Sequence, residues 1–207
     1  MAISKAAIRG EVVSQRKALP TEENYARSTV IGKSFVRTLA RYAKNLQGLK
    51  IGLYRALPFE VDLTELIVFF ELKGAHLYFP KVSDPTAKTM DFVQVSPSEE
   101  TIEWKKGALG IEEPCSILPV AEANSLDIVI VPGIAFGTAF ERVGMGAGYY
   151  DRYFSAAPKA LRIALVFDFQ VYDQIEQATW DQKMDWIFGE NLDIKGPRTL
   201  EWLNKSS

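Results

Sequence analysis

A glycine-rich stretch in the second half of the chain carries the residues best suited to chemistry. Residues 142–152 read RVGMGAGYYDR, so three glycines alternate with other residues. This spacing is typical of a loop that takes positive φ angles and lies close against a ligand. Arg142 could neutralise phosphate oxygens, and Asp151 could hold a divalent cation through its carboxylate oxygens. The stretch therefore predicts a site for a phosphate group and a metal ion.

The neighbouring segments place this stretch between a strand and a helix. The apolar run at residues 126–131 predicts a buried strand that ends at Pro132-Gly133, and residues 149–156 have the composition of a short helix. The free N–H groups and the dipole of a helix N-terminus favour a bound anion. The spacing is neither the dinucleotide fingerprint GxGxxG nor a Walker A loop, so a tight structural turn explains the glycines equally well.

Composition limits the class of protein. The chain has 207 residues, 47% hydrophobic and 24% charged, with a formal net charge of −2. These values fit a soluble α/β domain and argue against a general nucleic-acid binder. No run reaches the roughly 18 apolar residues of a membrane span, and the N-terminus lacks the apolar core of a signal peptide. We expect a cytoplasmic monomer with no nucleic-acid or membrane partner.

Two scarce residue types exclude some chemistry. Cys115 is the only cysteine, so no intramolecular disulfide can form, which is consistent with a reducing compartment. His76 is the only histidine. A His-rich zinc site is therefore excluded, and a Ser-His-Asp triad could use only His76. Its position beside a predicted strand favours a structural role.

The start of the chain predicts two helices. Residues 4–19 form the first, in which Lys5 and Arg9 are four residues apart and project from the same side. This pair is either a solvated basic face or a two-pronged phosphate clamp. Thr21 is expected to cap the second helix, which reaches about residue 45.

Strands then alternate with helices. The predicted strands are residues 49–54, 75–79, 90–95, 126–131, 162–167 and 186–188, and the predicted helices are residues 63–73, 149–156 and 197–204. Asp62 is expected to cap the first of these helices, and residues 186–188 are expected to form the last strand. Residues 96–119 are irregular and are expected to form a loop that could act as a lid. The alternation predicts one α/β domain, residues 1–207, with a mostly parallel, doubly wound sheet flanked by helices.

Glu60 lies in the loop that follows the first predicted strand. Ligands collect at the carboxyl ends of strands in open α/β sheets. Glu60 is therefore a candidate ligand-binding carboxylate, with an ordinary surface residue as the alternative.

Several separated segments resemble one family, the 5-formyltetrahydrofolate cyclo-ligases, also called 5,10-methenyltetrahydrofolate synthetases. The most specific match is VPGIAF at residues 131–136, followed after a spacer by RVGMGAGYYDR. Weaker matches occur in order along the chain at Lys5 with Arg9, residues 54–62, residues 79–82, residues 110–114, and Asp181 with Asp185. Together the segments span nearly the whole chain.

The resemblance implies an ATP- and magnesium-dependent enzyme that converts 5-formyltetrahydrofolate to 5,10-methenyltetrahydrofolate and releases ADP and phosphate. The γ-phosphate would be transferred to the formyl oxygen, and the N10 nitrogen would attack the resulting iminophosphate before phosphate leaves. Such catalysis rests on positioning and charge neutralisation. It requires neither histidine nor cysteine.

The resemblance also implies roles for individual residues, with Arg142 and Lys5 as catalytic groups. The residues implied to bind ATP are Lys5, Arg9, Arg142, Val143, Gly144, Met145, Gly146, Ala147, Gly148, Tyr149 and Tyr150. Those implied to bind the folate substrate are Arg9, Tyr54, Arg55, Glu60, Met145, Gly146, Ala147, Gly148 and Tyr149. Asp151 and Asp181 would hold Mg²⁺, and Glu60 would accept hydrogen bonds from the pterin.

The chain departs from the family pattern at four positions. Gly137 and Phe140 stand where the family usually has Asp and Gly, Val143 replaces Leu, and Trp180 stands where many members have His. The first two departures support a second hypothesis, a catalytically silent protein that binds nucleotide or folate. A third is a relative of sugar-phosphate isomerases or acyl-CoA transferases, which would need no ATP.

Structural roles are the alternative for several candidates. Asp181 and Asp185 could belong to a solvated surface segment, and Tyr149 with Tyr150 could pack a helix onto the sheet. Arg142 and Asp151 could also pair with each other across the glycine loop.

Overall fold

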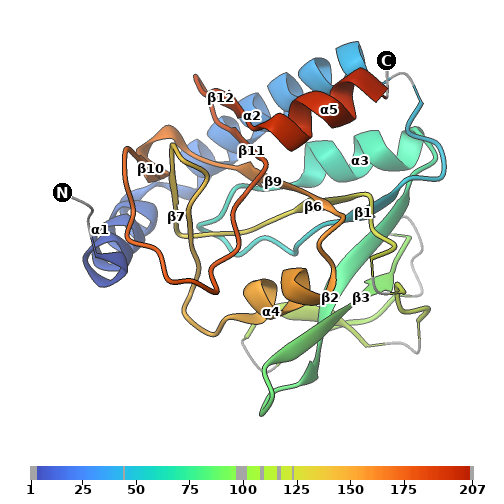
Figure 1. Ribbon diagram of the computed structural model, residues 1–207, viewed down its shortest axis with the longest axis horizontal. Coiled ribbons are helices and arrows are strands. Elements are labelled where there is room, and N and C mark those ends of the chain that lie inside the picture. Colours follow the sequence, from blue (N-terminus) through green and yellow to red (C-terminus); the bar gives the residue numbers. More distant parts are fainter. Residues whose placement is uncertain are drawn as a thin grey trace.

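The computed structural model describes residues 4–43, 45–96, 102–107, 110–115, 118–122 and 124–205. Helices lie on both sides of a central sheet (Figure 1). The elements are α1 (Lys5–Ala18), α2 (Thr21–Tyr42), β1 (Lys50–Gly52), α3 (Thr64–Leu72), β2 (His76–Asp84), β3 (Thr89–Gln94), β4 (Trp104–Lys106), β5 (Glu112–Pro114), β6 (Ile128–Ile130), β7 (Ala135–Gly137), β8 (Arg142–Val143), α4 (Tyr149–Ala156), β9 (Leu161–Leu165), the 3-10 turn η1 (Asp168–Gln170), β10 (Val171–Tyr172), β11 (Trp186–Phe188), β12 (Asp193–Lys195) and α5 (Pro197–Lys205).

The central sheet has seven strands in the order β12-β11-β9-β6-β1-β2-β3. The strands from β11 to β2 are parallel to one another, while β12 and β3 run antiparallel at the two edges. The chain builds outward from β1 in one direction through β2, and in the other through β6, β9 and β11. The predicted mostly parallel, doubly wound sheet is confirmed. Its topological switch point lies between β1 and β6, where open sheets bind ligands.

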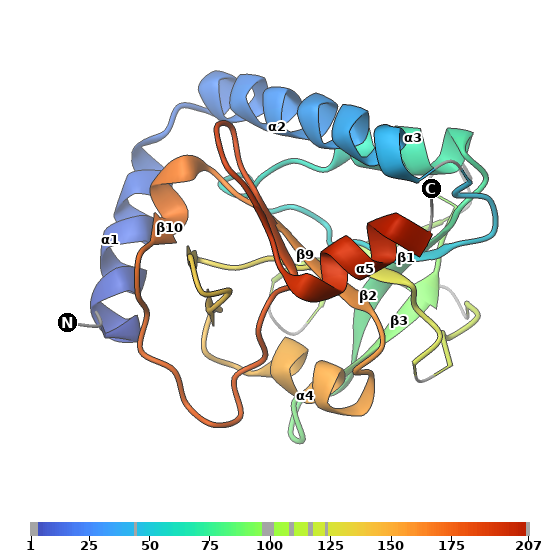
Figure 2. The same cartoon turned by 45° about the horizontal axis from the view of Figure 1, so that its top comes forward.

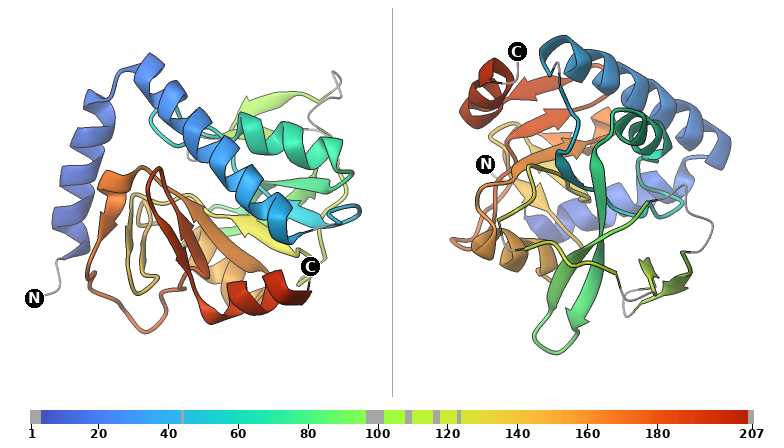
Figure 3. Two further views of the ribbon diagram at one scale, coloured as in Figure 1. Left: turned by 90° about the horizontal axis from the view of Figure 1, so that it is seen from above. Right: turned by 90° about the vertical axis from the view of Figure 1, so that its right-hand side faces the viewer.

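Alternate side chains of the strands enter two cores. In β6, Ile128 and Ile130 join the core that contains residues of α2, α3 and α5, whereas Val129 joins the core beneath α4. This alternation follows from the period of two in a strand. Figures 1 and 3 show α2 and α5 on one side of the sheet and α4 on the other. No helix in the described ranges is long and apolar enough to cross a membrane.

A small second sheet anchors α1. It has the order β10-β7-β8, and Ile8 and Val12 of α1 pack against Ala135 and Val143 in it. Figure 2 shows α1 alongside β10, at the end of the molecule where the chain begins. The sequence did not predict this sheet, because strands of two or three residues show no period. The sheet fixes α1 beside the segment that follows β8.

The predicted helices are confirmed within a few residues at their ends. The prediction that Thr21 caps the second helix is wrong, because Pro20 occupies the N-cap and Thr21 is already helical. The prediction that Asp62 caps the next helix is also wrong, because Leu63 occupies the N-cap of α3, although Oδ1 of Asp62 accepts the Thr64 N–H at 2.9 Å from one residue further out.

Three strand predictions need correction. β2 continues past Phe79 to Asp84 and pairs there with β3 alone, because its other neighbour, β1, ends opposite Tyr78. Pro80 is therefore at an edge of the sheet, where a proline is tolerated. Residues 186–188 are not the last strand, because the chain turns back and adds β12. The stretch expected to be irregular, residues 96–119, contains the antiparallel pair β4-β5 in its described part.

The turn between β7 and β8 holds both Gly137 and Phe140. Phe140 has φ +70°, a conformation that favours glycine, and its N–H donates to the Gly137 carbonyl oxygen at 2.9 Å. Its ring packs against the core beneath α4 and beside Gly196. The position of Gly137 has no room for a side chain, because an added Cβ would overlap the Glu141 carboxylate. The turn therefore combines a strained aromatic residue with a glycine that makes room for a buried acid.

This strain can be measured with two variants. Phe140→Ala and Phe140→Gly both remove the ring, but only glycine relieves the left-handed backbone. We expect the glycine variant to be the more stable of the two by about 1 kcal/mol, in urea unfolding with matched m-values. An alanine variant of equal or greater stability would show that the turn carries no such strain.

Candidate active site

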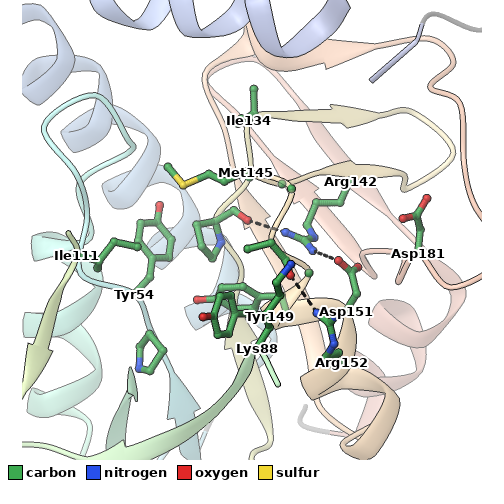
Figure 4. Close-up of a pocket in the computed structure, with 18 of the residues that line it drawn as sticks. Tyr54, Lys88, Ile111, Ile134, Arg142, Met145, Tyr149, Asp151, Arg152 and Asp181 are labelled. Atoms are coloured by element: carbon green, nitrogen blue, oxygen red, sulfur yellow. Dashed lines mark hydrogen bonds and ion pairs between the residues drawn. The ribbon is translucent and has the colours of Figure 1, made fainter. Parts of the chain in front are cut away.

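A cavity of about 480 Å³ opens at the carboxyl ends of β1 and β6. Its walls come from the loop after β1, residues 132–134 after β6, the glycine-rich segment, the start of α4, α1 and the segment at residues 180–181. In Figure 4, side chains from several of these elements lie around one space, among them Tyr54, Met145 and Arg142. The cavity thus occupies the topological switch point of the sheet.

Most of the residues predicted from the sequence line this cavity. They are Lys5, Arg9, Tyr54, Arg55, Glu60, Arg142, Gly144, Met145, Gly146, Ala147, Gly148, Tyr149, Tyr150, Asp151 and Asp181. Val143 does not, because its side chain is fully buried in the core beneath α1. Its side chain anchors the start of the loop, and the implied role of Val143 in ATP binding stays a prediction.

Backbone geometry explains the glycines. Gly146 has φ +101° and Gly148 has φ +77°, and Gly148 is the N-cap of α4. An L side chain at either position would strain the backbone. Gly144 is favoured for another reason, since an added Cβ would lie 2.8 Å from an Arg142 guanidinium nitrogen and would displace a side chain that is paired with Asp151. The loop therefore leads directly into a helix N-terminus, as predicted for an anion site.

A buried ion pair spans the base of the loop. Nη2 of Arg142 lies 2.9 Å from Oδ2 of Asp151, and Arg142 Nη1 also donates to the Pro132 carbonyl oxygen at 3.3 Å. The guanidinium also lies 5.6 Å from the centre of the Tyr150 ring. Oδ1 of Asp151 accepts the Gln182 N–H at 3.1 Å. The two charged residues therefore pair with each other, and both still line the cavity.

The basic pair of α1 points to the same loop. Lys5 forms an ion pair with Asp181, whose carboxylate also accepts the Ala178 N–H at 2.6 Å. Nε of Arg9 donates to the Gly144 carbonyl oxygen at 2.9 Å. This geometry favours the clamp interpretation over a solvated basic face.

The carboxylates in the cavity suit a hard cation. Asp151 and Asp181 each accept only two hydrogen bonds from the described residues, so oxygen lone pairs are left over. Mg²⁺ is usually held by one or two carboxylates together with substrate phosphates and waters. Three-ligand clusters of His, Cys, Asp and Glu are absent from the described residues. The donor set therefore fits a metal that arrives with a phosphate ligand.

Asp185 has a structural role instead. It accepts the Arg162 N–H at 2.9 Å and an Arg198 guanidinium hydrogen bond at 3.1 Å. It is absent from the cavity lining. Of the two acids matched in this segment, only Asp181 belongs to the site.

Glu60 faces the cavity from the opposite wall. Its side chain is buried at 8% exposure, and its Oε2 accepts the Leu57 N–H at 3.0 Å. Burial raises the pKa of Glu60, while the Leu57 hydrogen bond and the positive charge of Arg16 partly offset that rise. Beside it, the Tyr54 hydroxyl donates to the Val61 carbonyl oxygen at 2.9 Å. Among the described residues, Oε1 of Glu60 has no partner, so this oxygen can accept hydrogen bonds from a ligand.

Arg55 links the loop after β1 to the β4-β5 hairpin. Its Nε donates to Glu112 at 2.9 Å, and its guanidinium lies 4.9 Å from the centre of the Trp104 ring. Ile111, next to β5, lines the cavity. The described part of the segment expected to act as a lid therefore forms part of the wall.

Some lining residues received no role from the sequence. They are Pro80, Lys88, Ile111, Pro132, Gly133, Ile134, Arg152, Ser155 and Trp180. Arg152 was visible at the end of the glycine-rich motif, and its Nη1 donates to the Ala147 carbonyl oxygen at 2.9 Å. Lys88 had no signal, because it belongs to the β2-β3 turn and the predicted strand ended at residue 79. His76 lies outside the cavity, where its Nδ1 is 3.3 Å from the Gln94 side-chain amide.

Comparison with known proteins gives a consistent result. Residues 2–190 match the model of the 5-formyltetrahydrofolate cyclo-ligase family. A 5-formyltetrahydrofolate cyclo-ligase of Mus musculus is 26% identical over 196 residues, which cover 91% of this chain and 94% of the relative. The Escherichia coli K12 protein of the same name is 24% identical over 170 residues, which cover 81% and 90%.

Solved structures agree with the sequence matches. The Aquifex aeolicus 5,10-methenyltetrahydrofolate synthetase superposes with a TM-score of 0.75 at 28% identity, covering 92% of both chains. The Mycoplasma pneumoniae 5,10-methenyltetrahydrofolate synthetase shares the fold, with a TM-score of 0.72 at 23% identity over 90% of this chain and 99% of that one. Because the family model covers most of its length, the chain belongs to the 5-formyltetrahydrofolate cyclo-ligase family.

Proposed function

We propose that this chain catalyses the ATP-dependent conversion of 5-formyltetrahydrofolate to 5,10-methenyltetrahydrofolate, with release of ADP and phosphate. One observation carries the proposal. A single cavity is lined by a glycine loop with the cations Lys5, Arg9 and Arg142 and by the buried carboxylate of Glu60. A triphosphate and a pterin are complementary to these two walls, and family membership agrees with this pairing.

On the phosphate wall, cations and backbone N–H groups would bind ATP. Lys5 and Arg9 approach the loop from α1, and Arg142 approaches from its base. Asp151 and Asp181 would hold Mg²⁺, which would offset the negative charge of the phosphates. The positive end of α4 adds to the same field.

On the folate wall, Glu60 would recognise the amino-pyrimidine edge of the pterin. That edge presents N–H donors, and a carboxylate accepts two such bonds with good geometry. The raised pKa of Glu60 means that burial disfavours its ionised form. N–H donors of the substrate would stabilise the ionised form of Glu60. The hydrogen bonds to Glu60 would therefore contribute strongly to folate binding.

The proposed reaction has two steps. The formyl oxygen attacks the γ-phosphorus, an O–P bond forms, and the bond to the β-phosphate oxygen breaks with ADP as the leaving group. The N10 nitrogen then attacks the activated carbon, loses its proton, and the C–O bond breaks to release phosphate. Arg142 and Lys5 would balance the charge of the transferred phosphoryl group, and the two walls would hold the reacting atoms in line.

The direct test is an absorbance assay for 5,10-methenyltetrahydrofolate. The purified protein receives 5-formyltetrahydrofolate with ATP and Mg²⁺, and parallel reactions omit each component. We expect product only in the complete mixture. Folded protein that binds ATP or folate without turnover would support the silent-binder alternative, and turnover without ATP would contradict the mechanism.

The Arg142–Asp151 pair can be tested by a double-mutant cycle. We expect Arg142→Ala to lower kcat by about 100-fold or more, as when a charge-stabilising donor is removed, and Asp151→Ala to lower activity comparably. If the pair served only to hold the loop, removing both residues would leave no unpaired charge and activity would recover. We expect the double variant to stay inactive while circular dichroism shows a folded protein. Arg37→Ala, on the exposed face of α2, controls for the lost charge.

Replacing Glu60 tests whether folate binding and ATP binding depend on different walls of the cavity. We expect Glu60→Gln to raise the KM for the folate substrate about tenfold, as for a lost hydrogen bond to a charged group, with little change in the KM for ATP. An equal rise in both KM values would contradict a pterin role.

Glu60→Gln should also change the stability of the protein in a way that depends on pH. Because burial raises the pKa of Glu60, the folded state binds this proton more tightly than the unfolded chain does. The contribution of Glu60 to stability is therefore fully present below its pKa in the unfolded chain. This contribution is lost as the pH rises through its pKa in the folded protein. We expect Glu60→Gln to raise the melting temperature of the ligand-free protein at neutral pH, and this gain to vanish in acid. A gain that is independent of pH would contradict this explanation.

A further inference from the structure

An exposed tryptophan lines the cavity of the candidate active site. Trp180 is 72% exposed and forms part of the cavity wall next to Asp181. The other three tryptophans have a structural role, because Trp104, Trp186 and Trp202 belong to the large core or pack against it. Trp180 therefore offers a large flat aromatic surface that the fold itself does not use.

The turn that carries Trp180 is held from three directions. The Asp181 N–H donates to the Ala178 carbonyl oxygen at 3.1 Å, and the Asp181 carboxylate accepts the Ala178 N–H at 2.6 Å. Lys5 of α1 pairs with the same carboxylate, and the N–H of the residue after Asp181 donates to Asp151 of α4 at 3.1 Å. The backbone that presents the indole is therefore fixed, so a ligand that contacts the ring pays little to order it.

The proposed reaction determines which end of ATP lies near this turn. The γ-phosphate has to meet the formyl group of a folate held at Glu60, so the base is the part of ATP farthest from Glu60. Tyr54 lies on the same wall as Glu60. In Figure 4, Tyr54 and Asp181 lie on opposite sides of the space, with Arg142 between them. A triphosphate held at Arg142 would therefore direct its base toward the Asp181 side, which carries Trp180.

A nucleobase suits the exposed indole. Aromatic side chains stack on nucleobases because every base has a flat π face. A single exposed apolar residue is ordinary on a protein surface and needs no ligand to explain it. Trp180 differs from that case, because its ring borders the cavity and its neighbour Asp181 pairs with Lys5, a cation proposed to bind the phosphates.

We propose that Trp180 is the stacking surface for the adenine base of ATP. This inference rests on the proposed function, which sets the direction of the nucleotide. Stacking does not distinguish one base from another, so Trp180 would strengthen the binding of ATP and GTP alike. An aromatic ring of the folate is the competing partner, but it would have to extend from Glu60 past the phosphates to reach Trp180.

Equilibrium binding with and without a base tests this assignment. The Kd values for ATP and for inorganic tripolyphosphate, each with Mg²⁺, are measured by calorimetry for the wild-type protein, Trp180→Ala and Trp180→Phe. We expect Trp180→Ala to raise the Kd for ATP about tenfold, as for the loss of one base–aromatic stack. The Kd for tripolyphosphate, which has no base, should stay unchanged. Trp180→Phe keeps an aromatic ring and should retain most of the affinity for ATP.

Tryptophan fluorescence provides a second measurement that needs no turnover. A base stacked on an indole quenches its emission, so ATP should quench the wild-type protein and tripolyphosphate should not. We expect this quenching to be lost in Trp180→Phe. Trp202→Phe is the matched control, because it removes an indole that packs on the core from α5, and it should retain the quenching.

Three results would overturn the stacking role. Unchanged ATP binding in Trp180→Ala is the first. Equal weakening of ATP and tripolyphosphate is the second, because Trp180 would then act on the phosphates through its neighbour Asp181. The third is a higher KM for the folate substrate alone, which would assign the ring to the folate. Wild-type protein that binds ATP through Trp180 but forms no 5,10-methenyltetrahydrofolate would contradict the proposed function and support the stacking role.

Discussion

The buried ion pair between Arg142 and Asp151 is the interaction on which the site depends. It joins the start of the glycine loop to the first turn of α4, and Arg142 is only 7% exposed. An unpaired guanidinium at this depth would be costly, so the Asp151 carboxylate stabilises the folded protein. Lys5 and Asp181 form a second pair on the other side of the cavity. On our proposal, the cations of both pairs would turn to the phosphates of ATP and their carboxylates would hold Mg²⁺. The charges that bind the ligands are therefore already present in the ligand-free protein, each balanced by its partner.

This arrangement requires α1 to lie beside the loop, and a few apolar residues achieve it. Ile8 and Val12 face the small sheet, while Lys5 and Arg9 lie on the side that faces the cavity. Val143 links the two roles, because its side chain joins that core and the next residue, Gly144, accepts the hydrogen bond of Arg9. The core therefore positions the charges, and a change in β8 that disturbs its packing would also displace the phosphate wall.

The sequence predicted the parts of this design that depend on local patterns. The parallel sheet follows from apolar runs such as residues 126–131, and the phosphate loop follows from the glycine spacing and its flanking charges. Contacts between distant segments could not be predicted, because Lys88 reaches the cavity only through the β2-β3 turn and the extension of β2 depends on where its β1 neighbour ends. The pairing of Lys5 with Asp181, 176 residues apart, likewise requires the folded chain. The small sheet β10-β7-β8 was not predicted because its strands are too short to show a sequence pattern.

The departures at Gly137 and Phe140 are the only sequence features that favoured a silent binder, and the structure gives them a local cause. Glu141 fills the space in which a side chain at position 137 would begin, so one carboxylate is lost there and another lies beside it. Phe140 accepts an unfavourable backbone and packs its ring against the core beneath α4. Neither residue lines the cavity, whereas Arg142, Asp151 and the glycines that shape the phosphate wall are all present in it. A compensated change in a turn outside the cavity gives no reason for the loss of catalysis, and the active enzyme is therefore the better-supported of the two hypotheses.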